Sequence, residues 1–232
     1  MEAHMTSIEF EPFAKIARLN RNITITEKID GTNGCIVITH SENLDGIQHI
    51  DKFFDRIVDG DARKTIAKVG PYVVMVQSRN RFITPKDDNY GFAGWVERNA
   101  EALVRLLGAG RHYGEWWGSG IQSKYGLTGG DKRFSLFDTK CWGGLGSELF
   151  DTVPGLGVVP VLYEGVWDQQ EIDDALTYLD AYGSVAAPGF MRPEGIVVYH
   201  AALRSSFKVT LHGDAAPKGA AGHALDNEKV AV

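Results

Sequence analysis

Short runs of β-branched and aromatic residues follow one another along most of the chain, and this pattern is typical of strands in partly buried sheets. It predicts eight strands, at residues 22–27, 34–39, 72–78, 112–117, 133–138, 158–163, 194–200 and 205–211. Most of these runs come in neighbouring pairs, as the strands of antiparallel sheets do. The sequence therefore predicts largely antiparallel sheets.

Apolar residues recur at helical spacing in only a few places. Residues 91–107 predict one helix that ends at Gly108, and residues 168–182 predict another that begins at Asp168. A shorter helix is predicted at 47–58. Few helices combined with adjacent strand pairs indicate an α+β fold.

Two Gly-rich segments, 143–157 and 212–223, are expected to be loops or a loose tail. The chain has 232 residues, of which 44% are hydrophobic and 10% aromatic, so it is long enough to bury a sizeable core. We expect one domain over residues 5–211 and a loose C-terminal tail over 212–232.

The formal net charge is −6, whereas proteins that hold nucleic acid through phosphates usually present a basic face. Any such face must therefore be local. Lysine and arginine gather at residues 62–68, 78–86 and 123–133. Each cluster has a simpler interpretation as solvated surface.

The two cysteines, Cys35 and Cys141, are too few for a disulfide framework, and neither has a second Cys or His at metal-ligand spacing. We expect both to be reduced thiols in the core. No apolar run approaches the roughly 20 residues of a membrane helix, and the first ten residues lack the apolar region of a signal peptide.

Between the first two predicted strands lies the segment ITEKIDGTNG, residues 25–34. Asp30-Gly31 is a strong turn signal that would explain a hairpin. It does not explain Lys28, which stands at the end of an apolar run. Lysine at that place is a candidate for chemistry, although a lone KxDG sequence also occurs by chance.

Other charged residues also interrupt apolar strands or stand at their ends, where clefts form and where charged groups need partners. Each could be only a loop cation or a strand-edge charge. Taken in chain order, the set comprises Arg79, Arg81, Glu115, Asp138, Glu194 and Lys208.

This order resembles the covalent nucleotidyltransferase superfamily, which contains polynucleotide ligases and messenger-RNA capping enzymes. KIDG is similar to its KxDG motif, YGEWWG to its glutamate motif, FSLFD to its aromatic motif, EGIVVY to its EGxVx strand and SSFKVT to its last, lysine-bearing motif. Asn33 and the segment GEWWGSGIQ most closely resemble the RNA ligase 2-like branch found in many phage genomes. The resemblance spans about residues 22–211.

The resemblance implies a ligase adenylation domain with its nucleotide cleft between antiparallel sheets flanked by helices. There are two departures from the family pattern. The last motif often has two lysines, whereas the second position here is Thr210, which leaves open which family lysine Lys208 replaces. Ligases of this superfamily normally carry another domain, and we expect no accessory domain here.

The implied function is that of an ATP-dependent RNA ligase that joins 5′-phosphate and 3′-hydroxyl RNA ends through a lysyl-AMP intermediate and an adenylated RNA end. Lysine is almost wholly an ammonium at pH 7, with an ordinary pKa of about 10.4, so nearby metal and cations must favour the free amine. The carboxylates then hold a hydrated ion or the ribose and do not act as bases for Lys28.

The family assigns roles that these positions inherit by resemblance. Glu115 would hold the ribose, Glu194 would support the metal, and Arg79 and Lys208 would stabilise phosphate charge. Phe134 would stack on adenine, with Phe137 as second choice, on the opposite face of the strand.

The residues expected to take part fall into three overlapping sets. The catalytic set is Lys28, Asp30, Glu115, Glu194 and Lys208. The nucleotide-binding set is Glu27, Lys28, Ile29, Asn33, Arg79, Glu115, Phe134, Glu194 and Lys208. The metal set, for Mg²⁺ or Mn²⁺ held through water, is Asp30, Glu115 and Glu194.

Two alternatives stay open. The same scaffold serves DNA ligases and capping-type guanylyltransferases, and a non-catalytic nucleotide- or RNA-binding module could keep the same residues. The expected partner is RNA, with no obligate protein partner and no membrane. The expected location is the cytoplasm, that of the host if a phage encodes the protein.

Overall fold

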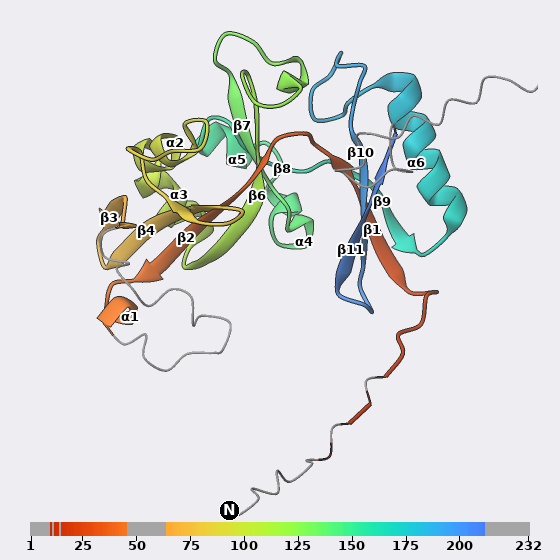
Figure 1. Ribbon diagram of the computed structural model, residues 1–232, viewed down its shortest axis with the longest axis horizontal. Helices are drawn as coiled ribbons and strands as arrows, with labels where there is room; N and C mark the ends of the chain where they lie inside the picture. Colours follow the sequence, from red (N-terminus) through yellow and green to blue (C-terminus); the bar gives the residue numbers. More distant parts are fainter. Residues whose placement is uncertain (1–9, 11, 14, 46–63, 212–232) are drawn as a thin grey trace, which may run out of the picture.

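The computed structural model describes residues 10, 12–13, 15–45 and 64–211. Two sheets stand side by side, the larger packed against several helices and the smaller against α6 (Gln169–Tyr182) (Figure 1). The predicted helix 47–58, the segment 212–223 and the predicted tail 212–232 lie outside the described residues. The α+β class and the largely antiparallel sheets are confirmed.

The smaller sheet has four antiparallel strands that come from both ends of the described chain. Their order is β11 (Ser205–Thr210), β10 (Gly195–His200), β1 (Asn22–Lys28) and β9 (Val161–Val166). Alternate residues of β1 are buried, and Ile23 and Ile25 pack with Ile172 and Leu179 of α6 (Gln169–Tyr182). The side chain of Asp168 caps α6 by accepting a hydrogen bond from the Gln170 amide, as the sequence predicts.

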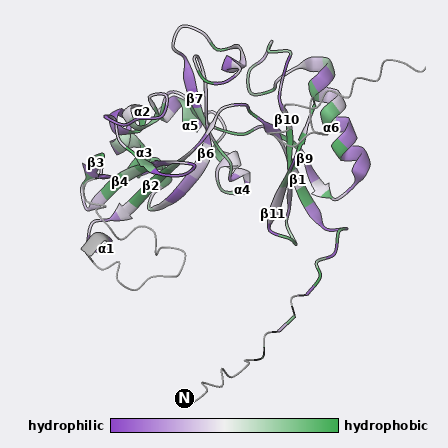
Figure 2. Ribbon diagram, in the orientation of Figure 1, coloured by the Kyte–Doolittle hydropathy of each residue, from purple (hydrophilic) through white to green (hydrophobic). Residues whose placement is uncertain are grey.

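The larger sheet has seven strands, of which β7 and β8 are the one parallel pair among the described strands. The order is β3 (Ala67–Val69), β4 (Tyr72–Ser78), β2 (Thr32–His40), β6 (Gly110–Gly118), β7 (Lys132–Leu136) and β8 (Leu156–Val158), and β5 (Phe82–Ile83) pairs with β4. Helices α2 (Phe92–Arg98) and α3 (Ala100–Leu107) supply Phe92, Trp95 and Leu103 to the core on one face. Figure 2 shows hydrophobic colour gathered on strands of both sheets and hydrophilic colour over most of α6.

A third cluster of buried residues joins the two sheets. It consists of Ile29, Trp117, Tyr125, Val159 and Ala187, which come from five different parts of the chain. Because burial of apolar side chains is the main favourable term in folding, this cluster fixes one sheet against the other.

Several predicted elements differ in their boundaries. The helix predicted at 91–107 is two helices separated at Asn99, whose side-chain amide donates a hydrogen bond to the Trp95 carbonyl at 2.8 Å. Asparagine competes for backbone groups in this way, which interrupts a helix. The strand predicted at 158–163 is two strands in different sheets, because Pro160 between them cannot continue a hydrogen-bonded ladder.

The loop predicted at 143–157 contains regular structure that is too short to show a periodicity. It includes the 3₁₀ turn η3 (Gly143–Leu145), α5 (Glu148–Thr152) and strand β8. The remaining short elements are α1 (Glu42–Asp45), α4 (Thr139–Trp142) and the 3₁₀ turn η2 (Lys124–Gly126). Strands β3 and β5 were likewise missing from the prediction because they have three and two residues.

The two cysteines differ in environment. Cys35 is buried in β2, as predicted, and burial raises the pKa of its thiol to about 12. Cys141 lies in α4 and is exposed, so its assignment to the core is wrong. Helix α4 has only four residues and none of them is buried, so it offers no core position for this thiol.

Within the described part of the chain, none of the helices combines the length and the apolarity that crossing a membrane requires.

Candidate active site

The segment that carries Lys28 does not form a hairpin turn. Strand β1 ends at Lys28 and β2 begins at Thr32, but the two strands belong to different sheets. Residues 29–31 carry the chain from one sheet to the other, and Ile29 is buried in the cluster that joins them. The hairpin interpretation of Asp30-Gly31 is therefore wrong.

Gly31 is needed for close packing against β6. A Cβ atom at this position would lie 2.5 Å from the Trp116 carbonyl oxygen and 2.8 Å from Cβ of Trp117. The groups that approach Gly31 thus belong to Trp116 and Trp117 of the neighbouring sheet.

Lys28 forms an ion pair at the end of the smaller sheet. Its Nζ donates to Oε2 of Glu194 at 2.6 Å, and both side chains are partly buried. Lys28 pairs with Gly195 in the β1–β10 ladder, so the register of this ladder brings Glu194 beside the lysine. The two residues, 166 positions apart in the sequence, are thus brought together by the fold.

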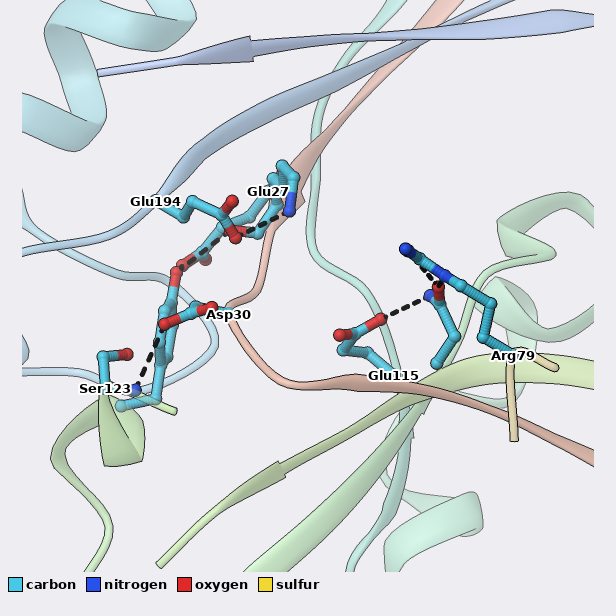
Figure 3. A network of polar contacts seen from close by, with 9 residues as sticks. Glu27, Asp30, Arg79, Glu115, Ser123 and Glu194 are labelled. Atoms are coloured by element: carbon cyan, nitrogen blue, oxygen red, sulfur yellow. Dashed lines mark hydrogen bonds and ion pairs between the residues drawn. The ribbon is translucent and has the colours of Figure 1, made fainter. Parts of the chain in front are cut away.

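A second group of predicted residues projects from the larger sheet. Asn33 of β2 and Glu115 of β6 are directly opposite each other, and the Asn33 amide donates to Oε2 of Glu115 at 2.9 Å. Arg79 donates from Nε and Nη2 to the Asn33 amide oxygen at 2.9 and 2.6 Å. Figure 3 shows this chain of contacts on one sheet and Glu194 on the other.

The charges of the two groups act on each other. Burial raises the pKa of Glu115 to about 7, the charge of Lys28 opposes this rise, and the charge of Glu194 adds to it. A hydrogen bond to the backbone of Gly31 and the charge of Arg79 also favour the ionised carboxylate. Lys28, Glu194, Glu115 and Arg79 therefore form one electrostatic site between the sheets, where perturbed carboxyl groups are typical of function.

Asp30 is fixed by the loop that follows β6. Its Oδ2 accepts a hydrogen bond from the Ser123 amide at 3.1 Å (Figure 3). In this loop Gln122, Lys124 and Tyr125 have positive φ values of 43°, 62° and 45°. Such conformations are uncommon for residues with a bulky side chain and must be held by their surroundings.

Glu27 holds β1 from the opposite face. Its carboxylate is 1% exposed and accepts hydrogen bonds from the Tyr125 hydroxyl at 2.7 Å and from the amides of Val185 and Ala186, each at 2.9 Å. The Tyr125 hydroxyl also lies 3.3 Å from the Lys28 carbonyl oxygen. The carboxylate of Glu27 is thus engaged with the protein and positions Lys28. Sequence reasoning missed Tyr125, since nothing marks one tyrosine in a Gly-rich loop.

Lys208 lies on the same face of the smaller sheet as Lys28 but one row away. It pairs with Val197, and Thr210 pairs with Gly195, which in turn pairs with Lys28. Residues two apart in a strand share a face. Thr210 therefore occupies the row of Lys28, and the exposed Lys208 occupies the next.

Phe134 is not placed to stack on a nucleotide between the sheets. Its exposed fraction is 0%, and its ring lies in the core 4.7 Å from the ring of Phe92. The β6–β7 register puts Ser135 opposite Glu115, so Phe134 belongs to the face that packs on α2. This placement does not fit the expectation for Phe134. The prediction that the Phe137 ring lies on the opposite face of the strand from Phe134 does agree with the structure, because Phe137 is 42% exposed.

The carboxylates are too dispersed to enclose a metal ion by themselves. Among the described residues, no three side chains of the types His, Cys, Asp and Glu converge as a metal site. Glu194 and Glu115 are nevertheless suited to a hydrated ion, because Mg²⁺ usually keeps several waters and takes one or two carboxylates together with substrate phosphates.

Comparison with known proteins identifies the family. The sequence model of the family described as RNA ligase matches residues 21–210, which is most of the chain. Among curated proteins, none is similar enough to count as a match.

Solved structures of an RNA ligase from Naegleria gruberi share the fold. A mutant with AMP and Mn has 19% sequence identity to the chain over 83% of its residues, with a TM-score of 0.51. The same ligase with PPi has 20% identity over 82% of the chain, also with a TM-score of 0.51. The chain spans about half the length of these proteins, since the matches cover 50% of theirs. On the evidence of the family model and of a site assembled from its motif residues, the chain belongs to the RNA ligase family.

Proposed function

We propose that this protein is an ATP-dependent RNA ligase that works through AMP bound covalently to Lys28. The observation that carries the proposal is the position of the Lys28 amine, at the end of a strand and 2.6 Å from Glu194, with Glu115, Asn33 and Arg79 on the facing sheet. An amine among charges of both signs is suited to nucleophilic attack on a phosphate. Membership of the RNA ligase family supports the same reaction.

In the first step the Lys28 amine attacks the α-phosphorus of ATP. The bond to the bridging oxygen breaks, pyrophosphate leaves, and the amine loses a proton, which leaves AMP on Nζ as a phosphoramidate. Lys28 must first leave its contact with Glu194, so that Glu194 becomes free to receive another cation. A divalent ion would supply positive charge to the phosphates when bound, with Glu194 and Glu115 as its carboxylates.

In the later steps the AMP passes to RNA and is then released. An oxygen of the RNA 5′-phosphate attacks the phosphorus of AMP, and the Lys28 amine leaves. A 3′-hydroxyl then attacks the activated 5′-phosphate, AMP departs and a phosphodiester bond forms. The guanidinium of Arg79 and the amine of Lys208 would stabilise the charge on the transferring group.

Labelling with radioactive nucleotides tests this proposal. ATP with Mg²⁺ or Mn²⁺ should leave one AMP per chain, detected as a covalent band and as a mass increase. GTP should give no label, because the branch that the sequence resembles uses ATP. The Lys28→Ala protein should remain folded and unlabelled, and Lys140→Ala in α4 is the matched control that should label normally.

The competing functions predict different outcomes of the same experiment. Labelling by GTP would favour a capping-type guanylyltransferase, and the absence of any covalent label would favour a binding module. An AMP adduct that survives in the Lys28→Ala protein would overturn the assignment of the lysine. Sealing of labelled RNA ends, compared with DNA ends, distinguishes an RNA ligase from a DNA ligase.

A further inference from the structure

On the face of the larger sheet that carries Glu115, a second row of side chains lies next to the row that contains the site. Phe82 of β5, Gln77 of β4, Cys35 of β2 and Tyr113 of β6 are aligned by the strand registers. The amide of Phe137 donates to the Tyr113 carbonyl at 3.0 Å, so Phe137 extends the row by one position. We call these five residues the aromatic row.

The aromatic row lies directly next to the site. Tyr113 precedes Glu115 by two residues on one face of β6, which places it about 7 Å away, or two stacked base steps of about 3.4 Å each. Cys35 stands in the same relation to Asn33 on β2. A nucleic acid strand whose end reaches the site can therefore reach the row with its next nucleotides.

Two of the aromatic side chains in the row are exposed to solvent. Tyr113 is 50% exposed and Phe137 is 42% exposed, although they are direct neighbours across the strands. Cys35 beside them is buried, and with its thiol pKa at about 12 it offers little chemistry of its own.

Three cations lie beside the aromatic row or the site next to it, although the protein carries a net charge of −6. Arg111, one row further along β6, donates to the Gln77 side chain at 2.5 Å. Lys64 lies over the ring of Phe82 at 5.6 Å from its centre, and Arg79 follows β4 beside Asn33. Exposed aromatic rings beside cations are the means by which proteins hold unpaired nucleic acid, since bases stack on the rings and phosphates meet the cations.

We infer that Tyr113 and Phe137 form a stacking surface for unpaired RNA nucleotides that adjoin the reacting end. The inference rests on the proposed function for the identity of the polymer, and it adds a place where that polymer is held. A purely structural role for this cross-strand pair would stabilise the sheet instead and would leave RNA affinity unaffected.

Substitutions that remove the aromatic face but keep an apolar side chain test the inference, together with substitutions that keep the aromatic face. Tyr113→Leu and Phe137→Leu keep an apolar side chain but remove the aromatic face, whereas Tyr113→Phe and Phe137→Tyr keep the face. We expect each leucine variant to bind a fluorescent unpaired oligoribonucleotide with on the order of tenfold lower affinity, and the aromatic variants to bind like wild type. Tyr182→Leu on α6, which replaces a 70% exposed tyrosine, is the matched control and should have no effect.

The salt dependence of binding identifies the kind of contact. Loss of a stacking contact should lower affinity at every salt concentration and leave the slope of log affinity against log salt unchanged. Transfer of AMP from each variant to RNA should fall in parallel with RNA affinity, when it is normalised to the self-adenylation rate of the same variant. Thermal melting of every variant reports its folding.

The outcomes distinguish this inference from the function on which it rests. If the leucine variants bind RNA as tightly as wild type, or if the aromatic variants lose as much affinity as the leucine variants, the stacking surface is refuted. If wild type binds RNA through the row but takes no AMP from ATP, the proposed function fails and the binding surface stands.

Discussion

Glu115 is a single residue whose protonation depends on the whole site. Its carboxyl is partly buried between the sheets, accepts the Asn33 amide, and is acted on by the charges of Lys28, Glu194 and Arg79. Burial is the largest of these influences and raises its pKa from 4.5 to about 7. This pKa lies near neutral pH, where a bound cation would favour the ionised form.

This pKa predicts how stability depends on pH. A carboxyl whose pKa is raised by folding contributes stability that is fully present below about pH 4.5 and is lost as the pH rises through 7. Glu115→Gln removes this titration. The unfolding free energy of the variant, relative to that of wild type, should therefore increase between pH 4 and 8, by up to about 3 kcal/mol.

Denaturant unfolding at several pH values measures this difference. Glu148→Gln on the exposed surface of α5 is the matched control and should follow the wild-type profile. A difference between Glu115→Gln and wild type that stays constant over this pH range would contradict the assigned pKa. If the proposed function holds, the same variant should lose self-adenylation by orders of magnitude, since it lacks a charge placed beside the transferring phosphoryl group.

The end of strand β1 is the element on which the site depends. On one face its Glu27 carboxylate is bound by Tyr125 and by two backbone amides, and beyond Lys28 the chain passes directly against β6 at Gly31. These contacts come from the loop after β6, the segment after α6 and the facing sheet. The position of the Lys28 amine is therefore a property of several elements together.

Gly31→Ala tests this dependence. The new Cβ would meet the Trp116 carbonyl, which belongs to backbone and cannot move away cheaply. We expect a loss of about 1–3 kcal/mol in unfolding free energy. We also expect slower self-adenylation in the fraction that remains folded, because the end of β1 must shift.

Gly157→Ala in β8 is the matched control for this clash. No atom lies within 4 Å of the Cβ that it would introduce, so its stability and labelling rate should match those of wild type. Equal melting temperatures for the Gly31→Ala protein and wild type would show that the sheets can separate at this point without cost.

The charge of the whole molecule bears on how it would hold the RNA of the proposed function. Several residues of the basic clusters are already engaged within the protein: Arg81 pairs with Asp87, Arg133 pairs with Asp131 at 3.2 Å, and Lys132 donates to the Tyr90 carbonyl at 2.7 Å. Of the cluster at 62–68, residues 62 and 63 lie outside the described part of the chain. In the described part of these clusters, fewer cations are thus left to neutralise phosphates than the sequence suggests, and we expect weak RNA binding that falls as salt rises.

Lys124 should be one of the residues responsible for that salt dependence. Its side chain is exposed in the loop that contacts Asp30, so a strand bound at the site would pass close to it. Lys124→Gln should reduce the slope of log affinity against log salt by about one. Arg105→Gln, on the exposed side of α3, is the control and should leave the slope unchanged. Equal slopes for Lys124→Gln and wild type would place the RNA elsewhere.

Local pattern was sufficient for most strands and for the motif residues. The β-branched runs of β1, β2, β4, β10 and β11 occur where the sequence predicts them. Successive side chains of a strand point to opposite faces of the sheet, so the pattern of a strand can be recognised from consecutive residues. The helix start at Asp168 was also predictable, because a capping side chain acts within a few residues of its own position. Interruptions such as Asn99 were not predicted, since the helical pattern continues across them.

The sequence by itself determined the fold class, the family resemblance and the set of charged residues that can carry chemistry. Only the tertiary structure decided which of them meet. Lys28 and Glu194 are brought together by pairing between the first and tenth strands, and Phe134 is turned into the core by the register of β6 and β7. The separation of β1 from β2 and the packing at Gly31 also depend on contacts between sheets. A residue's type and its near neighbours set its chemistry and its local conformation, but register and packing between distant segments set which way its side chain points.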